Sequence, residues 1–185
     1  DAARVEVLRG PQSLIWGADA IGGVISIETA AGGAPFAGYV EGGSFATVRG
    51  GVAVEAARGG DYLRASAHVQ RTDGVSRAAA GVEADGFRSI GGGLAGALAL
   101  DSTWTIEARA RVSRATADID GFPPPAFALA DTAEESRTER ASFTMRALHA
   151  GTASGALTLG YALTDRRDQD GAVETFTSKG DRFAA

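Results

Sequence analysis

The chain has 185 residues, of which 26 are glycine and none is cysteine, and its formal net charge is −5. The absence of cysteine excludes a disulfide framework and a cysteine-based metal site. The acidic balance argues against a nucleic-acid-binding protein, because a surface that neutralises phosphates must be basic.

The beginning of the chain predicts two short strands joined by a turn. Residues 4–8 alternate apolar and charged side chains, which is the period of two expected of a half-buried strand. Gly10–Pro11 ends this pattern, because proline has no N–H for a strand ladder and glycine permits a sharp turn. Mostly β-branched residues at 24–27 predict a second strand, and Gly22–Gly23 suits close backbone packing or a bulge. On local pattern alone, an ordinary β-turn-β element of a soluble domain fits equally well.

The whole stretch from Val5 to Thr29 resembles the end of the plug domain of TonB-dependent outer-membrane receptors. That family commonly reads VEVxRGPxSxLYGxxAxGGVINIxT at this place. This chain departs from the pattern at Ile15, where leucine is frequent, at Trp16, where tyrosine or phenylalanine is usual, and at Ser26, where asparagine is frequent. The residues that we expect to define the plug motif are Arg9, Gly10, Pro11, Gly17, Gly22 and Gly23.

Beyond residue 35 the sequence falls into long alternating segments, which predict β-strands. No apolar run approaches the roughly twenty residues of a transmembrane helix, whereas a strand of a membrane barrel needs only about ten residues with one apolar face. A soluble sandwich also alternates, but its strands average about five or six residues. The predicted strands lie near 36–46, 48–58, 61–72, 87–100, 103–115, 137–150 and 155–167, and an eighth begins near Lys179.

The alternation assigns side chains to two faces. One face is apolar and would meet lipid in a membrane barrel, with Leu63, Ala65, Ala67, Val69, Ile106, Ala108, Ala110, Leu157, Leu159 and Leu163. The other face is polar and suits a wet or plug-filled lumen, with Arg64, His68, Glu107, Arg109 and Arg111. Aromatic residues near the strand ends, where the interfacial girdles of barrels lie, are Tyr62, Phe87 and Trp104.

The connections between these strands are unequal in length. We expect short ones after the second, fourth and sixth strands, a tight one after the first, and an intermediate one after the seventh. Long loops are expected at 73–86 and 116–136. Short turns on one rim and longer loops on the other are typical of outer-membrane barrels. The predicted fold is all-β: residues 1–32 form the C-terminal end of a plug, and residues 33–185 form about seven or eight antiparallel strands of a larger transmembrane barrel.

The sequence contains no recognisable catalytic constellation, so we do not expect an enzyme. The two histidines, His68 and His149, have no neighbouring pattern that names a catalytic partner, and we expect the first to line the lumen and the second to lie near an interface. The glycine cluster at 91–93 lacks the lysine and hydroxyl residue of a phosphate-binding loop, and reads as strand glycines.

Acidic residues in the two expected long loops form a candidate metal site. Carboxylates from adjacent loops can hold Ca²⁺, which takes six to eight oxygen ligands. The order and spacing of the loops resemble those of cobalamin receptors, and this resemblance implies Asp85, Asp120 and Asp131 as calcium ligands, with Glu83 beside them. The proline run at 123–125 departs from that family's pattern. An ordinary solvated rim of carboxylates is the alternative.

The resemblance implies a receptor of the Gram-negative outer membrane that takes up a scarce nutrient, such as cobalamin or a ferric siderophore, through a plugged barrel. The implied partners are outer-membrane lipid, the small nutrient ligand, and TonB, contacted through a segment expected to precede Asp1. No nucleic-acid partner is expected. A non-transporting adhesive or structural β-protein of the cell surface, or a passive porin, is the alternative.

Arg9 is the residue that we expect to join plug and barrel. The resemblance places it facing the barrel wall, where a buried arginine would need a carboxylate partner. The inward-facing acids available for this role are Glu41, Glu55 and Glu107.

Overall fold

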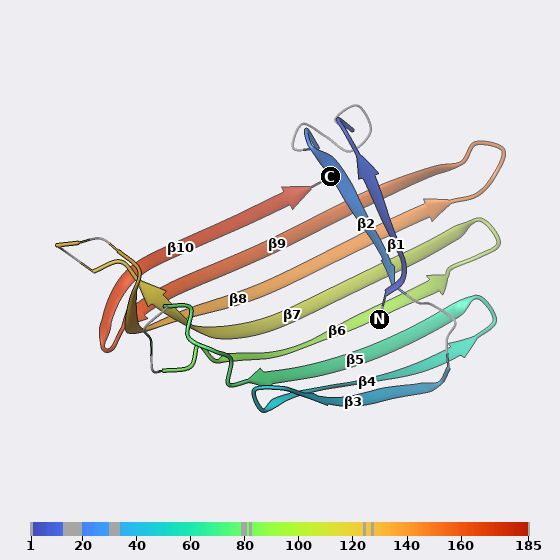
Figure 1. Ribbon diagram of the computed structural model, residues 1–185. Coiled ribbons are helices and arrows are strands. Elements are labelled where there is room, and N and C mark those ends of the chain that lie inside the picture. The colour runs from blue at the N-terminus through green and yellow to red at the C-terminus, as the bar shows by residue number, and fades with distance from the viewer. Residues whose placement is uncertain are drawn as a thin grey trace. The chain divides into compact units, whose positions relative to one another are not determined.

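A computed structural model describes residues 2–12, 20–29, 34–78, 81, 83–123, 125–126 and 128–184. The chain divides into two compact units, Asp1–Gly33 and Ala34–Ala185. All secondary-structure elements of the described residues are β-strands (Figure 1). None of these residues forms a helix of the length and apolar character that a membrane crossing requires.

The first unit contains an antiparallel hairpin of β1 (Ala2–Arg9) and β2 (Gly23–Thr29). Both strands were predicted from the sequence, and their register places Val5 opposite Ile27 and Val7 opposite Ile25. These four side chains share one face, and each is more than half exposed. A two-stranded hairpin is at best marginally stable in water, so this apolar face needs a surface to pack against.

Gly23 begins β2 with a backbone conformation that favours glycine. Its φ is +146°, and a Cβ at this position would stand 2.5 Å from the carbonyl oxygen of Leu8. Gly22 has no such neighbour, since a Cβ there would meet nothing within 4 Å. Close backbone packing was predicted for Gly22–Gly23, and Gly23 is the one that lies against the opposite strand.

The second unit is one antiparallel sheet in which every strand pairs with its neighbours in the sequence. The strand order is β10-β9-β8-β7-β6-β5-β4-β3, which is an uninterrupted meander (Figure 1). The strands are β3 (Phe36–Gly43), β4 (Thr47–Arg58), β5 (Asp61–Thr72), β6 (Phe87–Ala99), β7 (Trp104–Gly121), β8 (Ala130–His149), β9 (Gly155–Asp170) and β10 (Val173–Ala184).

Two of the predicted connections were wrong in length. The loop expected at 116–136 is confined to 122–129, because β7 and β8 continue to pair beyond their apolar part, for example at Asp118 and Glu135. Backbone hydrogen bonds hold a ladder together whatever the polarity of the side chains. The eighth strand begins at Val173 rather than near Lys179, since a two-residue turn with Gly171 at a φ of 59° joins it to β9.

The short turn between β6 and β7 is organised by Asp101. Its Oδ1 accepts hydrogen bonds from the Thr103 hydroxyl and amide, both 2.7 Å away, and from the Trp104 amide at 2.8 Å. These hydrogen bonds, that from the Thr103 hydroxyl first, lower the pKa of Asp101. Asp101 is fully exposed, and it fixes the residue with which β7 begins.

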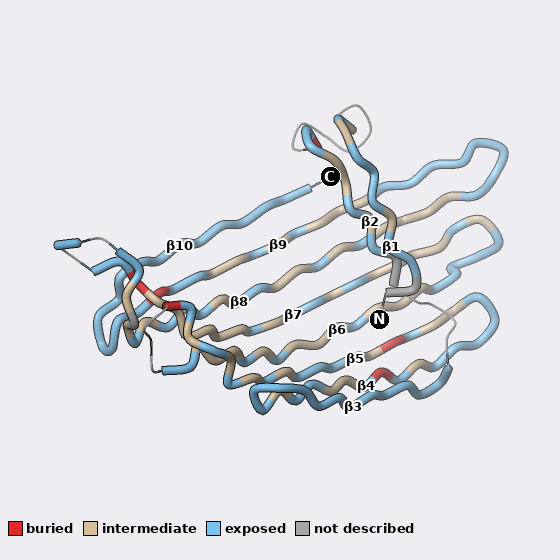
Figure 2. The backbone as a smooth tube through the Cα atoms, viewed as in Figure 1, coloured by how far each residue is buried: buried red, intermediate tan, exposed pale blue. Residues whose placement is uncertain are grey.

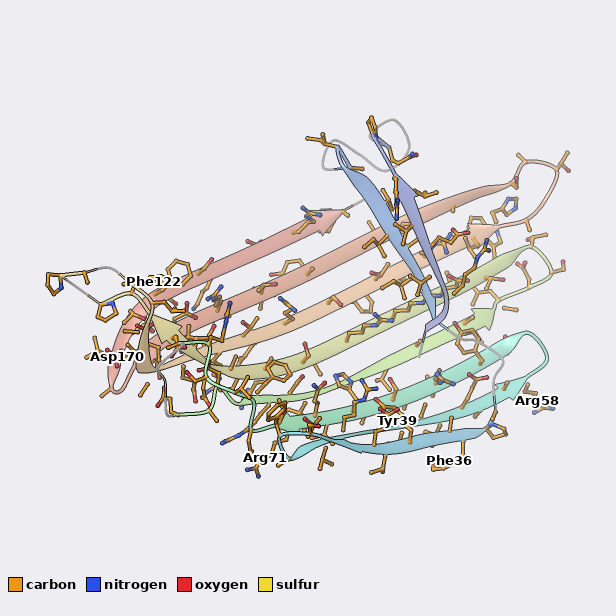
Figure 3. The ribbon with its side chains drawn as sticks, viewed as in Figure 1. Phe36, Tyr39, Arg58, Arg71, Phe122 and Asp170 are labelled. Atoms are coloured by element: carbon orange, nitrogen blue, oxygen red, sulfur yellow. The ribbon has the colours of Figure 1, made fainter. Side chains whose placement is uncertain are left out.

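The register confirms that the predicted side chains separate onto two faces. Neighbouring strands place Ala65, Leu94, Ala110 and Phe143 in one row across the sheet. The intervening residues form rows on the opposite face, where polar side chains predominate. Side chains project from both sides of the strands in Figure 3.

The aromatic residues do not all share the apolar face. Trp104 lies there, opposite His149 in the register and with its ring centroid 4.7 Å from that of the histidine. Tyr62 and Phe87 also lie near strand ends, but the expectation that they belong to a lipid-facing girdle was wrong. Tyr62 lies two residues from Arg64 on β5 and so shares its polar face. Phe87 is opposite Thr72, which lies on the same face. A position near a strand end does not by itself fix the face on which a side chain lies.

The described part of the sheet has no hydrophobic core of its own. Ala53 is the only buried apolar residue of its described strands, and large apolar side chains such as Leu63 (61%) and Val112 (62%) are mostly exposed. Figure 2 shows β3 and β10 exposed along their whole length, and mostly exposed or intermediate positions along the other strands of the sheet. Water-soluble domains bury the apolar face of a sheet against a second layer, and no such layer is present among the described residues of this unit.

The contrast between the two adjacent glycines gives a test of the hairpin. We expect Gly23→Ala to destabilise the hairpin in the intact protein by about 1–3 kcal/mol, because the new Cβ would press on the Leu8 carbonyl and the φ would be strained. Gly22→Ala is the matched control, with no comparable loss. Denaturant unfolding of both variants measures the difference, and equal stabilities would contradict the assigned backbone conformation.

Candidate functional site

The polar face carries charge pairs that lie directly opposite one another on adjacent strands. Glu55 pairs with Arg64 at 3.2 Å, and both side chains are nearly inaccessible, at 2% and 10% exposed. Glu107 pairs with Arg146 at 3.2 Å across β7 and β8. Opposite charges facing each other across strands stabilise the pairing, so these contacts help to fix the register of the sheet.

The acids expected to meet Arg9 therefore already have arginine partners within the sheet. Glu41 pairs with Arg49 on the neighbouring strand, and Glu55 and Glu107 pair as described above. Arg9 itself ends β1 in the first unit and is exposed there. An ion pair between Arg9 and the sheet stays a prediction, and it would require one of these carboxylates to be shared between two guanidinium groups.

A hollow of about 740 Å³ lies on the polar face and crosses β5 to β9. Hydroxyl and cationic side chains predominate among its polar groups, which include Ser66, His68, Arg111, Arg140, Ser142 and Thr164. These residues offer hydrogen-bond donors and positive charge without any carboxylate. The hollow can therefore hold water, a polar ligand or polar groups of another segment.

The sequence missed one polar cluster at the loop end of the polar face. Asp168 is 8% exposed, accepts a hydrogen bond of 2.6 Å from the Ser136 hydroxyl, and forms an ion pair of 2.8 Å with Arg166. By itself, the charged run at 166–168 in the sequence suggests a solvated rim. The sequence did contain a signal that β9 continues here, because the alternation of period two extends through Thr164, Arg166 and Asp168. In the structure, β9 pairs with β8 along all three residues.

Three of the four acids proposed for calcium lie together in the structure. One carboxylate oxygen each from Glu83, Asp85 and Asp120 can be chosen so that all lie within 4.8 Å of one another. The segment leading to β6 supplies the first two acids, and the end of β7 supplies Asp120. The side chain of Asp131 lies outside the described residues, so its part in this acidic cluster stays a prediction.

Backbone amides orient two of these carboxylates. The Arg77 amide donates to Asp85 Oδ2 at 2.7 Å, and the Ala78 amide donates to Asp120 Oδ2 at 2.7 Å. The second oxygen of Asp85, Oδ1, is buried and has no hydrogen-bond partner among the described residues. A hard cation fits this donor set, since Ca²⁺ binds carboxylate oxygens and completes its six to eight ligands with carbonyls and water.

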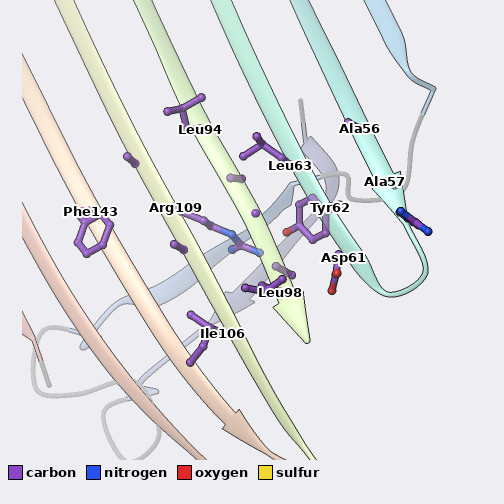
Figure 4. Close-up of a pocket in the computed structure, with 16 residues that line it drawn as sticks. Ala56, Ala57, Asp61, Tyr62, Leu63, Leu94, Leu98, Ile106, Arg109 and Phe143 are labelled. Atoms are coloured by element: carbon purple, nitrogen blue, oxygen red, sulfur yellow. The ribbon is translucent and has the colours of Figure 1, made fainter. Parts of the chain in front are cut away.

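A second hollow, of about 640 Å³, lies towards the short-turn end of the sheet (Figure 4). Small residues, among them Gly96 and Ala108, leave space between larger apolar ones. The larger side chains that surround it are Leu63, Leu94, Leu98, Ile106 and Phe143. Its walls are mainly apolar, so it suits a hydrocarbon chain rather than a reacting polar substrate.

Most of the residues expected to define the plug motif lie in the described part of the chain. Gly10 has a φ of 90°, and its amide bonds to the Gly22 carbonyl at 3.2 Å, so the chain turns where Gly10–Pro11 was expected to break the strand. Gly22 and Gly23 lead into β2. Gly17 lies outside the described residues, and no structural role is assigned to it.

The acidic cluster predicts calcium binding. We expect the intact protein to bind Ca²⁺, and Asp85→Asn and Asp120→Asn each to weaken that binding at least tenfold, because each removes a charged ligand. Isothermal titration calorimetry with calcium chloride measures the affinity. Glu135→Gln is the matched control, since Glu135 lies nearby on β8 outside the cluster. Unchanged affinity in both aspartate variants would leave these residues as a solvated rim.

The comparisons with known proteins identify no family. The sequence matches no protein-family model, and no curated protein matches it. The functional assignment therefore depends on the residues and geometry described above.

Proposed function

We propose that the chain is part of a TonB-dependent outer-membrane receptor, with the hairpin at the end of its plug and the eight-stranded sheet as the first part of its barrel wall. Such a receptor captures a scarce nutrient outside the cell and passes it through the barrel when the plug is remodelled. The sequence from Val5 to Thr29 supports the receptor family. The geometry of the sheet supports a barrel wall.

One observation carries this proposal: the long, one-layer sheet has an apolar face that no other described residue of its own unit covers. Exposed apolar patches of this extent are rare on monomeric soluble proteins and mark an interaction surface. Lipid is the covering that requires no partner of complementary shape. The opposite face, with its ion pairs and polar hollow, suits a plug-filled lumen.

The dimensions of the apolar face agree with a bilayer. On β7 it extends from Trp104 to Val112, after which Arg114 and Thr116 continue the same face. Eight residue steps of about 3.4 Å span about 27 Å, and a strand tilt of 35–45° reduces this to about 19–22 Å across the membrane. Outer-membrane barrels have an apolar band about 25 Å tall.

The alternatives differ in what they require of the first unit. An adhesive or structural surface protein needs no plug, and a passive porin has none, so neither accounts for the motif between Val5 and Thr29. Both would still use the apolar face of the sheet. Stability in a membrane therefore tests for the barrel, whereas nutrient uptake separates a receptor from the other two classes.

Two alanines on opposite faces test the membrane assignment. We expect Ala108→Arg to cost about 2–4 kcal/mol of folding stability in bilayers, because its position near the middle of the apolar face would bring a charge to the membrane midplane. Ala97→Arg is the matched control, since Ala97 lies on the polar face opposite Glu107. Urea unfolding of the intact protein in vesicles measures both, and equal costs would contradict a lipid-facing surface.

Uptake by cells tests the receptor function. We expect cells that produce the intact protein to accumulate its nutrient, screened among radiolabelled cobalamin and ferric siderophores, and to lose accumulation on deletion of TonB or collapse of the proton gradient. Surface binding of the same ligand should persist in both conditions, because binding precedes transport. Accumulation that continues without TonB would indicate a passive pore, and binding without any accumulation would indicate a surface protein.

A further inference from the structure

Four arginines form a single row on the apolar face, at its loop end. The register places Arg71 opposite Arg88, Arg88 opposite Thr116, Thr116 opposite Arg137, and Arg137 opposite Arg167. We call Arg71, Arg88, Arg137 and Arg167 the cationic row. It crosses five strands and contains no acidic residue from β5 to β9. Two of its pairs place like charges directly opposite, which is destabilising unless something neutralises them.

The next row towards the apolar part is balanced in charge. It contains Arg114, Glu139, Asp165 and Lys179 at successive register positions. The two carboxylates are already shared: Glu139 pairs with Arg114 at 2.9 Å and with Arg137 at 2.7 Å, while Asp165 pairs with Arg167 at 3.1 Å and Lys179 at 3.6 Å. Two carboxylates therefore serve four cations, and positive charge remains.

The excess of positive charge is confined to one level of the sheet. The row beyond the cationic row, away from the apolar part, contains Asp118 opposite Glu135, and Asp73 pairs with Arg71 at 3.3 Å. A surface adapted only for solubility would have no reason to gather four arginines in one row that contains no carboxylate. A layer of anions at a fixed height above a hydrocarbon layer, which is the arrangement of lipid phosphates, would account for this pattern.

A hollow lies between the balanced row and the apolar part of the same face. It has a volume of about 620 Å³, and Ala67, Ile90, Gly92, Val112 and Leu163 form its apolar walls. Arg114, Glu139 and Asp165 border it as well. The small side chains at positions 67 and 92 leave the space. At its charged end, Arg114 lies beside Glu139 and Asp165, and the cationic row follows one row further on, where a headgroup would emerge. The site is thus amphiphilic, with room for a hydrocarbon chain next to donors for an anion.

We propose that the cationic row and the adjoining hollow bind a membrane lipid with a phosphate-bearing headgroup, whose phosphate lies against Arg88, Arg137 and Arg167 and whose acyl chain enters the hollow. This inference rests on the proposed function, because it needs the apolar face to lie in a bilayer. Arginine suits the task, since its planar guanidinium donates two parallel hydrogen bonds to phosphate oxygens.

Lipid retention by the purified intact protein tests the headgroup contact. The protein, folded in neutral detergent, is titrated with phosphatidylglycerol or phosphatidylcholine, and bound lipid is counted by native mass spectrometry. We expect preferential retention of phosphatidylglycerol. Substitution of Arg88, Arg137 and Arg167 together by glutamine should lower its apparent affinity about a hundredfold, since each basic residue near an anionic surface contributes about fivefold.

The matched control is Arg49→Gln. Arg49 lies on the polar face of β4, opposite Gln70, and its loss should leave phosphatidylglycerol retention unchanged. Equal retention of both lipids by the unaltered protein would overturn the proposal. So would undiminished phosphatidylglycerol retention in the triple variant, because the cationic row would then not contact the headgroup.

Two further arms identify the source of the phosphate and separate this proposal from the preceding one. Ala141→Phe should reduce phosphatidylglycerol retention by filling the hollow, and inorganic phosphate should compete only weakly. Full competition by inorganic phosphate, with no effect of Ala141→Phe, would indicate a free-anion site and overturn the lipid assignment. If Ala108→Arg and Ala97→Arg differ as expected in vesicles while the lipids are retained equally, only the present inference fails.

Discussion

The structure depends on one constraint, the antiparallel register of eight neighbouring strands. Side chains alternate with a period of two, so a slip of one residue at any pair would move a whole strand's apolar set to the other face. Opposed Glu–Arg pairs on the polar face, such as Glu55 with Arg64, oppose that slip with charge. The same register places Trp104, the apolar band and the arginines at successive heights, so that each level of one face has its own chemistry.

This layering connects the parts of the molecule that function would use. In the proposed receptor the apolar part of the sheet would meet hydrocarbon. The charged rows lie at its loop end, and the acidic cluster of Glu83, Asp85 and Asp120 lies beyond them. The polar hollow lies on the other face of the sheet. In the proposed receptor, this face would line the interior, and the hairpin's exposed valines and isoleucines would belong to the plug. None of these surfaces is covered by other described residues of its own unit. In the proposed receptor, lipid would cover the apolar face, and the plug and the ligand would cover surfaces of the interior.

The sequence predicted the strands and faces well because both follow from local alternation. It predicted β5 to the residue, and it placed Leu63 and Arg64 on the correct faces. It failed where alternation carries little information: polar segments such as 116–121 read as loop, although the ladder from the neighbouring apolar part continues through them. The meeting of Glu83, Asp85 and Asp120 was suggested by resemblance, whereas the rows of arginine on the apolar face became visible only with the register.

The two edges of the sheet have a consequence for how the protein is made. Among the described residues, β3 and β10 each have a strand neighbour on one side only, and Val40 and Phe183 stand 84% and 68% exposed on them. An open edge is a template for any extended chain, including a second copy of the same sheet. The interval between synthesis and the pairing of both edges is therefore the period of greatest aggregation risk, and a chaperone that shields β3 and β10 would protect the chain more than one that binds its loops.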